Sequence, residues 1–278
     1  MAILRKFFTE NDDLQSIIYN YLQKDKIIKI NKISTGWTNI VFDVQTKDNG
    51  NYIFRFPRND FFADKINKDV KANNFLINKI NLKTVKMSIN SIDNKQFSVH
   101  QKIEGIPLIN RLDELSDEKL NNIAIEISEF FYKLHNIDIN IIPDILKIRL
   151  SDFLINLPKV NKDKYNYSDL LELQQDEENN LVFVHGDLNA GNIILDNNDN
   201  ICAFIDFAFV GLSDIYCDLS RISCRVGDVF FNKILTNYEK ISNKNLDLEK
   251  IRKRNKMWKY IEEQYILYMK KNFPEIKC

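Results

Sequence analysis

The sequence predicts an α+β fold in two parts: a five-stranded antiparallel sheet with one helix, then a mostly helical part that holds a small β hairpin. Apolar residues alternate with a period of two through most of residues 27–103, and they recur at helical spacing beyond Pro107. Gly105 and Pro107 break the chain between the two patterns. The 278 residues therefore indicate an N-terminal lobe over 1–103 and a C-terminal lobe over 104–278, with ligands bound in the groove between them.

The first part opens with a helix over residues 12–22 and continues with runs of β-branched and aromatic residues. The polar turns at 47–50 and 93–94 indicate two hairpins. Helical spacing over 62–80 inserts one helix between those hairpins. The five strands are expected at 27–30, 39–44, 52–56, 85–92 and 96–103.

In the second part, Ser116 is placed to cap a helix that runs to His135, because two acidic residues follow it and apolar residues then recur at helical spacing. Further helices are expected at 145–157, 168–175, 229–241 and 246–272. Short β segments at 181–184, 192–195 and 201–207 form a small β island among these helices.

Composition excludes several classes of protein. The 39 basic and 39 acidic side chains cancel, which argues against a nucleic-acid-binding protein. No stretch approaches the roughly 18 apolar residues of a membrane span, and the N-terminus has no apolar signal segment. Four cysteines without CxxC spacing and three histidines leave little material for a zinc site. We therefore expect a cytoplasmic protein with reduced thiols and no nucleic-acid or membrane partner.

The most informative segment is 184–207, in which three polar residues stand among apolar strand residues. Asn192 follows Asp187 by five positions, and Asp206 follows after fourteen more. A carboxylate surrounded by apolar residues needs a cation or strong hydrogen-bond donors. Asn192 and Asp206 offer the oxygen ligands that Mg²⁺ prefers, which leaves Asp187 to accept a proton from a hydroxyl nucleophile. This pattern indicates phosphoryl transfer from a nucleotide.

The same pattern resembles the kinase signature, with His185-Gly186-Asp187 in place of His-Arg-Asp and Phe207-Ala208 after the second Asp. Together with Gly191-Asn192 and the later Asp214 and Asp218, the segment resembles the aminoglycoside phosphotransferase and choline kinase superfamily. The resemblance implies a protein-kinase-like two-lobed fold and phosphorylation of a small-molecule hydroxyl with ATP or GTP and Mg²⁺.

The resemblance also implies individual roles. Asp187 corresponds to the catalytic base, and Asn192 and Asp206 to the metal ligands. His185 corresponds to the residue that braces the catalytic loop, the alternative being an ordinary structural histidine. Asp214 and Asp218 match an acidic pair that supports this loop, and both are also candidate substrate contacts. A helix N-cap is the competing interpretation for Asp214.

In the N-terminal lobe, the resemblance places the phosphate-gripping basic residue at Arg55 and its acidic partner at Asp69. Arg and Asp depart from the usual Lys and Glu, and a surface arginine on a strand is the alternative. The phosphate-covering turn contains only one glycine, so the GxGxxG pattern is absent. The remaining nucleotide contacts are assigned to that turn and to the lobe connection, at Ser34, Thr35, Gly36, Gln101, Lys102 and Ile103.

The acceptor is inferred from charge. Seven aspartates against two arginines between His185 and Asp228 indicate an acidic cleft that favours a cationic acceptor. An aminoglycoside, choline and ethanolamine all fit this charge, and aspartates on exposed turns are the competing interpretation of the count. Residues 187–218, with the following Ile222-Ser223-Cys224-Arg225, resemble aminoglycoside kinases more than choline kinases. The resemblance therefore favours an aminoglycoside acceptor and an antibiotic-resistance enzyme. Choline, ethanolamine or another metabolite is the alternative acceptor, and a nucleotide-binding pseudokinase is the second alternative. On the last helix, Trp258 could cage an ammonium group, although its spacing also fits a core position, and Glu262 and Glu263 could bind amino groups.

Overall fold

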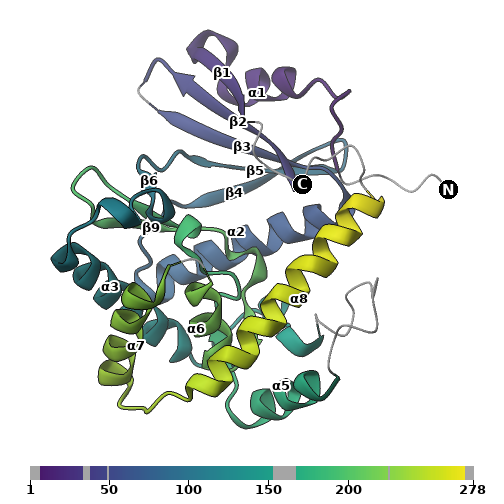
Figure 1. Cartoon of the computed structure of the whole chain (residues 1–278). Coiled ribbons are helices and arrows are strands. Elements are labelled where there is room, and N and C mark those ends of the chain that lie inside the picture. Colours follow the sequence, from purple (N-terminus) through teal and green to yellow (C-terminus); the bar gives the residue numbers. More distant parts are fainter. Residues whose placement is uncertain (1–6, 34–37, 49, 153–166, 225, 273–278) are drawn as a thin grey trace. The chain divides into compact units, whose positions relative to one another are not determined.

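The computed structural model describes residues 7–33, 38–48, 50–152, 167–224 and 226–272. The chain divides into two compact units (Figure 1). The N-terminal unit contains residues 1–78 and 84–104, and the C-terminal unit contains residues 79–83 and 105–278. No helix within the described residues is long and apolar enough to cross a membrane.

The N-terminal unit is built on a five-stranded antiparallel sheet with the strand order β1-β2-β3-β5-β4, which confirms the predicted sheet. Within the described residues, the α-helices of this unit are α1 (Leu14–Leu22) and α2 (Asp60–Ile80). The strands are β1 (Ile27–Ile33), β2 (Asn39–Thr46), β3 (Asn51–Pro57), β4 (Met87–Ile92) and β5 (Lys95–Gln101).

The hairpin between β4 and β5 follows from the two residues at its turn. Asp93 and Asn94 have φ values of 48° and 64°, the left-handed conformation that a two-residue hairpin turn needs. Asn and Asp tolerate this conformation better than other residues with a side chain. The short polar turn therefore fixes the register in which β4 pairs with β5.

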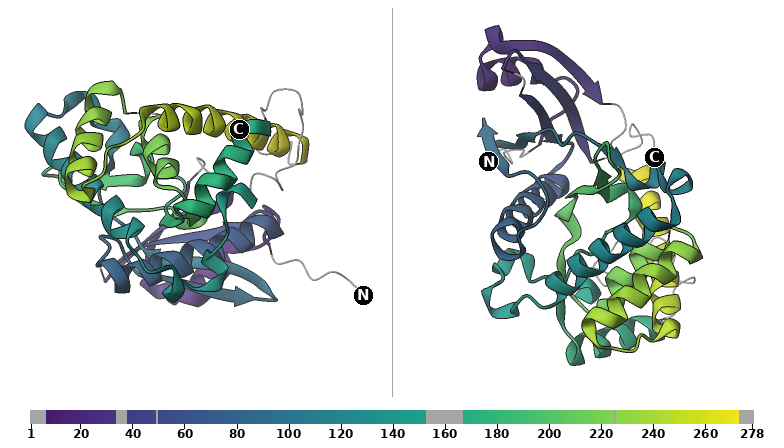
Figure 2. Two further views of the ribbon diagram at one scale, coloured as in Figure 1. Left: turned by 90° about the horizontal axis from the view of Figure 1, so that it is seen from below. Right: turned by 90° about the vertical axis from the view of Figure 1, so that its left-hand side faces the viewer.

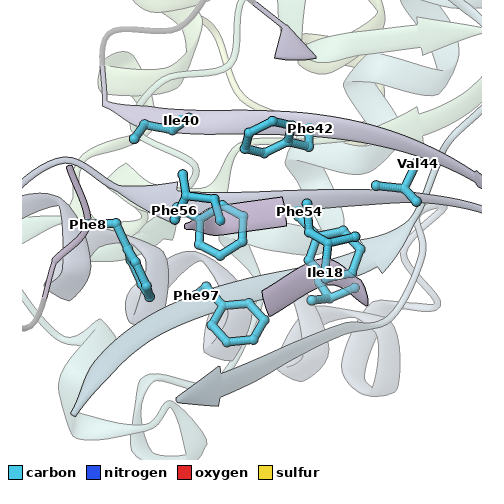
Figure 3. Close-up of a cluster of buried hydrophobic side chains, with 10 residues drawn as sticks. Phe8, Ile18, Ile40, Phe42, Val44, Phe54, Phe56 and Phe97 are labelled. Atoms are coloured by element: carbon cyan, nitrogen blue, oxygen red, sulfur yellow. The ribbon is translucent and has the colours of Figure 1, made fainter. Parts of the chain in front are cut away.

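Aromatic side chains make up much of the core on one face of this sheet (Figure 3). Phe54 and Phe56 alternate along β3, so both point to the same face, where they stack with Phe97 of β5. Phe8 closes one side of the cluster, with its ring centre 5.0 Å from that of Phe56. Ile18 of α1 belongs to the same cluster, which shows why α1 packs on this face.

The C-terminal unit is mostly helical (Figures 1 and 2). The helices are α3 (Asp117–His135), α5 (Tyr167–Asn179), α6 (Ile215–Ser223), α7 (Asp228–Ser242) and α8 (Leu248–Asn272). Helices α3 and α7 lie side by side, as do α6 and α8. The Ser116 side chain caps α3 by accepting the backbone N–H of Lys119, as the sequence predicts.

Short strands support the segment between α5 and α6. They are β6 (Ile106–Pro107), β7 (Val182–Val184), β8 (Ile193–Leu195), β9 (Ile201–Phe204) and β10 (Gly211–Ser213). Strands β8 and β9 form the predicted hairpin, and β6 adds a third strand to it. Strand β7 pairs instead with β10, a strand that the sequence pattern did not predict.

The helix expected over 145–157 is wrong at its start. Residues 144–146 form a 3₁₀ turn. Just after it, the backbone of Arg149 pairs with Leu212 of β10 in an isolated parallel β-bridge. Leu212 donates its N–H to the carbonyl of Ile148 at 2.9 Å, so this tertiary bond replaces the helical one. Helical backbone begins at Leu150, and residues 153–157 lie outside the described part of the chain.

Candidate active site

The predicted catalytic residues lie on a loop that leaves β7 at Val184 and enters β8 at Ile193. Gly186 has a φ of +76°, and a β-carbon at this position would lie 2.3 Å from the carbonyl oxygen of Phe209. Only glycine fits here, because both the backbone conformation and the close approach exclude a side chain. Gly186 thus allows the tight turn that presents Asp187.

His185 joins this loop to the segment that carries Asp206. Its Nδ1 accepts the backbone N–H of Asp187 at 3.3 Å, and its Nε2 lies 3.3 Å from the carbonyl oxygen of Ile205. An acceptor at Nδ1 fixes the neutral tautomer with the proton on Nε2, which then donates to Ile205. The ring packs against Phe207 with centroids 4.7 Å apart, and the residue is fully buried. His185 therefore braces two segments of the site.

Asn192 and Asp206 are brought together by the β8–β9 hairpin. The carbonyl oxygen of Asn192 accepts the N–H of Ile205 at 3.0 Å, immediately before Asp206. The Asn192 side chain donates through Nδ2 to the carbonyl oxygen of Asp187 at 3.0 Å, and within the described residues its Oδ1 has no partner. Asp206 has a left-handed backbone (φ 66°) at the start of a 3₁₀ turn. Hydrogen bonds therefore connect Asn192 to Asp187 and to Ile205, the residue directly before Asp206.

This donor set fits a hard divalent cation. One carboxylate, from Asp206, and one amide oxygen, from Asn192, are ligands of the kind that Mg²⁺ accepts. In the described part of the chain, no group of three or more His, Cys, Asp or Glu residues is arranged to hold a metal ion.

The carboxylate of Asp218 holds the start of the catalytic loop through hydrogen bonds to its backbone. This carboxylate accepts the backbone N–H groups of His185 and Gly186, at 2.9 and 2.8 Å, and also lies 3.1 Å from Nε2 of His135. His135 in turn lies 2.7 Å from the hydroxyl of Tyr238, whose pKa is raised by burial. Asp218 is completely buried, so both of its oxygens serve the loop and neither faces a bound acceptor.

Asp214 is also buried, and it caps α6 by accepting the N–H of Cys217 at 3.2 Å. Its other oxygen accepts from Arg254 at 2.7 Å, and Arg254 also donates to Asp176. The N-cap interpretation of Asp214 is therefore confirmed. Neither Asp214 nor Asp218 lies where the structure would let it contact a substrate, which removes much of the acidic surplus inferred from the sequence.

Arg221 is a site residue that sequence reasoning did not identify. Its Nε donates to Oδ1 of Asp187 at 2.6 Å, and its Nη1 donates to Oε1 of Glu262 at 2.6 Å.

Trp258 packs beneath the guanidinium of Arg221 and donates its indole N–H to the carbonyl oxygen of Cys217. It is 4% exposed and belongs to a hydrophobic cluster, so the core interpretation of this residue is correct. Glu263 is exposed and has no hydrogen-bond or ion-pair partner among the described residues.

The N-terminal unit contains the remaining predicted residues. Arg55 lies between Phe54 and Phe56 on β3, so its side chain takes the opposite face of the sheet, where it forms an ion pair with the fully buried Asp69 of α2. The backbone N–H of Lys102 is already bonded to Asn51, so it is not available to a nucleotide base.

The other residues predicted to contact the nucleotide also belong to this unit. The Lys102 ammonium pairs with Asp43 at 2.9 Å. Gln101 is exposed and Ile103 half-buried. Ser34, Thr35 and Gly36 lie outside the described residues.

Lys68, next to Asp69 on α2, is 7% exposed, and burial lowers its pKa to about 7, with a smaller effect from Lys65. Between the two pKa values the unfolded chain keeps a proton on Lys68 that the folded chain releases, so the free energy of unfolding rises with pH. This gain is fully present above the pKa of the unfolded lysine and is lost as the pH falls through about 7. We expect the free energy of unfolding to rise by about 2 kcal/mol more between about pH 7 and pH 9 in the wild type than in Lys68→Met. Urea unfolding at both pH values measures this difference, and equal pH dependence in the two proteins would contradict it.

Comparison with known proteins supplies independent information. Residues 29–240 match the model of a family described as the phosphotransferase enzyme family. No curated protein matches the chain. Among solved structures, the GDP and kanamycin complex of APH(2″)-IIIa superposes with a TM-score of 0.72 at 16% identity, covering 92% of this chain and 91% of that one.

Two further structures have the same fold. The streptomycin–ATP ternary complex of APH(2″)-IIa gives a TM-score of 0.66 at 19% identity, with coverage of 93% and 91% of the two chains. A macrolide 2′-phosphotransferase of type I gives 0.64 at 16% identity, with coverage of 90% and 89%. These likenesses show that the fold is the kinase-like one predicted from the sequence.

Proposed function

The chain belongs to the phosphotransferase enzyme family, and from this membership we propose that it transfers the γ-phosphate of ATP or GTP to a hydroxyl group of a small cationic molecule of the aminoglycoside type. One observation carries the proposal: Asn192 donates to the carbonyl oxygen of Asp187 and accepts the N–H of Ile205, which directly precedes Asp206. The backbone positions of a base and two oxygen donors are thereby tied together, and phosphoryl transfer requires such a set.

In the proposed reaction, Asp187 accepts the proton of the acceptor hydroxyl. Its Oδ1 is held by Arg221, and within the described residues its Oδ2 has no hydrogen-bond partner, so Oδ2 is the oxygen that takes the proton. As the proton leaves, the acceptor oxygen bonds to the γ-phosphorus, and the bond from that phosphorus to the oxygen bridging to the β-phosphate breaks. The products are a phosphate monoester and the nucleoside diphosphate.

The negative charge of the phosphates needs compensation in this proposal. Asn192 and Asp206 are the residues that would hold a magnesium ion, and such an ion would neutralise negative charge on the nucleotide phosphates. Arg55 contacts the α- and β-phosphates through guanidinium N–H groups, and its ion pair with Asp69 sets the direction of the side chain. A guanidinium can bind two phosphate oxygens at once, unlike the more usual lysine.

The aminoglycoside class is favoured over choline for a structural reason. Trp258 is buried under Arg221, so its ring is not available to enclose a quaternary ammonium group. Two structural neighbours are complexes with kanamycin and with streptomycin. The fold of a macrolide phosphotransferase is also similar, so macrolides belong in any test of acceptors.

The experiment is an acceptor panel in which nucleoside diphosphate release is measured with both ATP and GTP in the presence of Mg²⁺. The panel contains kanamycin, gentamicin, streptomycin, a macrolide, choline and ethanolamine. We expect turnover with at least one aminoglycoside and none with choline. Turnover only with choline or ethanolamine would establish a metabolite kinase instead. Mg²⁺-dependent nucleotide binding without turnover on any acceptor would indicate a pseudokinase.

A further inference from the structure

Arg221 of α6 joins two carboxylates that come from distant parts of the C-terminal unit. It donates to Asp187 on the catalytic loop and to Glu262 on α8, each at 2.6 Å. The partners are 34 and 41 residues away along the chain. Arg221 is itself 9% exposed, and its guanidinium carbon lies 5.3 Å from the centre of the Trp258 ring.

The position of Arg221 is strongly determined. Burial by itself lowers the pKa of this guanidinium, but attraction to Asp187 and hydrogen bonding to Glu262 outweigh burial and raise the pKa overall. The face of the Trp258 ring attracts the guanidinium, whose central carbon lies over the ring. A group with one ring beneath it and two charged acceptors in its plane has little rotational freedom.

This geometry orients Asp187. A carboxylate attached by one free bond can rotate, and rotation would carry the proton-accepting oxygen away from the acceptor. The short bond from Arg221 holds Oδ1, so the direction of Oδ2 is set. We propose that Arg221 is a positioning residue for Asp187, and that Glu262 serves the reaction by holding Arg221. This inference rests on the proposed function.

The proposal changes the role of Glu262. The sequence assigned this residue to the amino groups of an acceptor, whereas its Oε1 is bound to Arg221. Loss of Glu262 should therefore act on turnover through Arg221 rather than on the affinity for the acceptor. Among the three charges the negative excess is only one, so the site carries less negative charge than Asp187 and Glu262 alone would give it.

The test compares Arg221→Gln, Arg221→Lys, Glu262→Gln and the double variant Arg221→Gln/Glu262→Gln with the wild type, on the best acceptor of the panel. We expect Arg221→Gln to lower kcat about 10- to 100-fold, with acceptor and nucleotide KM values within about threefold of the wild type. Arg221→Lys should recover part of this loss, because an ammonium keeps the charge but cannot bind both carboxylates in the same fork. Glu262→Gln alone should lower kcat several-fold relative to the wild type. The double variant should have the same kcat as Arg221→Gln alone.

The matched controls are Arg252→Gln and Glu249→Gln, which remove an arginine–glutamate ion pair that is 68% and 69% exposed on the same helix α8. Both should leave kcat unchanged. If Arg221→Gln does not fold, Glu262→Gln carries the test, because it keeps the bond from Arg221 to Asp187.

Two outcomes would overturn the proposal. One is a kcat unchanged in Arg221→Gln and Glu262→Gln while the wild type transfers phosphate, which would leave the proposed function intact. The other is a rise in acceptor KM alone, which would make Glu262 a direct acceptor contact. A wild-type protein without any transfer contradicts the proposed function and this inference together.

Discussion

Replacing Asp187 with asparagine is expected to lower kcat by about 10²- to 10⁴-fold, the range of rate enhancement that a general base supplies. Asparagine has nearly the same shape, and its Oδ1 can still accept the bond from Arg221, so the loop should keep its structure. What is lost is the oxygen that takes the acceptor proton. Steady-state kinetics with the best acceptor measures the loss, and isothermal titration with the nucleotide should give affinity within about twofold of the wild type.

The control for this variant is Asp228→Asn, an exposed carboxylate in the first turn of α7. It should retain full turnover, because it lies outside the hydrogen-bonded framework of the site. If Asp187→Asn kept turnover within about tenfold of the wild type, Asp187 would not be the base. If it lost nucleotide binding as well, Asp187 would serve the nucleotide rather than the acceptor.

Replacing Asp218 with asparagine is expected to destabilise the protein by about 3–5 kcal/mol, the cost of removing one charged partner from a buried network. The carboxylate accepts two backbone N–H groups and lies beside His135 in a fully buried position. An amide presents one N–H₂ group toward these donors, so at least one of them is left without an acceptor. This is a large part of the total stability of a typical domain.

Urea unfolding of Asp218→Asn measures this cost, with Asp228→Asn again as the exposed aspartate, expected within about 0.5 kcal/mol of the wild type. If Asp218→Asn lowered the free energy of unfolding as little as Asp228→Asn does, the buried network would contribute little to stability. The Asp218→Asn protein that remains folded should keep part of its activity, because Asp218 holds the loop and does not contact the reacting groups.

Most of the N-terminal sheet was open to prediction because its signals are local. The alternation around Phe54 and Phe56 fixes one face of β3, and Asp93-Asn94 encodes the turn that sets the next hairpin. In both cases a few neighbouring residues determine the structure. The pair formed by Arg55 and Asp69 had a different source, because the family resemblance implied it.

The errors arise where distant parts of the chain compete for the backbone or for a side chain. Ile148 leaves its expected helix because Leu212, far along the chain, binds its carbonyl oxygen. The charge count around the motif treated Asp214 and Asp218 as available to a ligand, although both are buried against donors that no local pattern reveals. Arg221 stands one helical turn after Asp218, and that spacing was the one signal that could have placed it beside the catalytic loop.

The most direct test of the central claim is to follow the reaction by ³¹P nuclear magnetic resonance, with ATP or GTP, Mg²⁺ and the best acceptor. Wild-type protein is predicted to produce a phosphate monoester of the acceptor together with the nucleoside diphosphate, and Asp187→Asn to produce neither at a comparable rate. Inorganic phosphate as the only product from the wild type, or the same monoester formed equally fast by both proteins, would contradict the assignment of Asp187, Asn192 and Asp206 as the reactive centre.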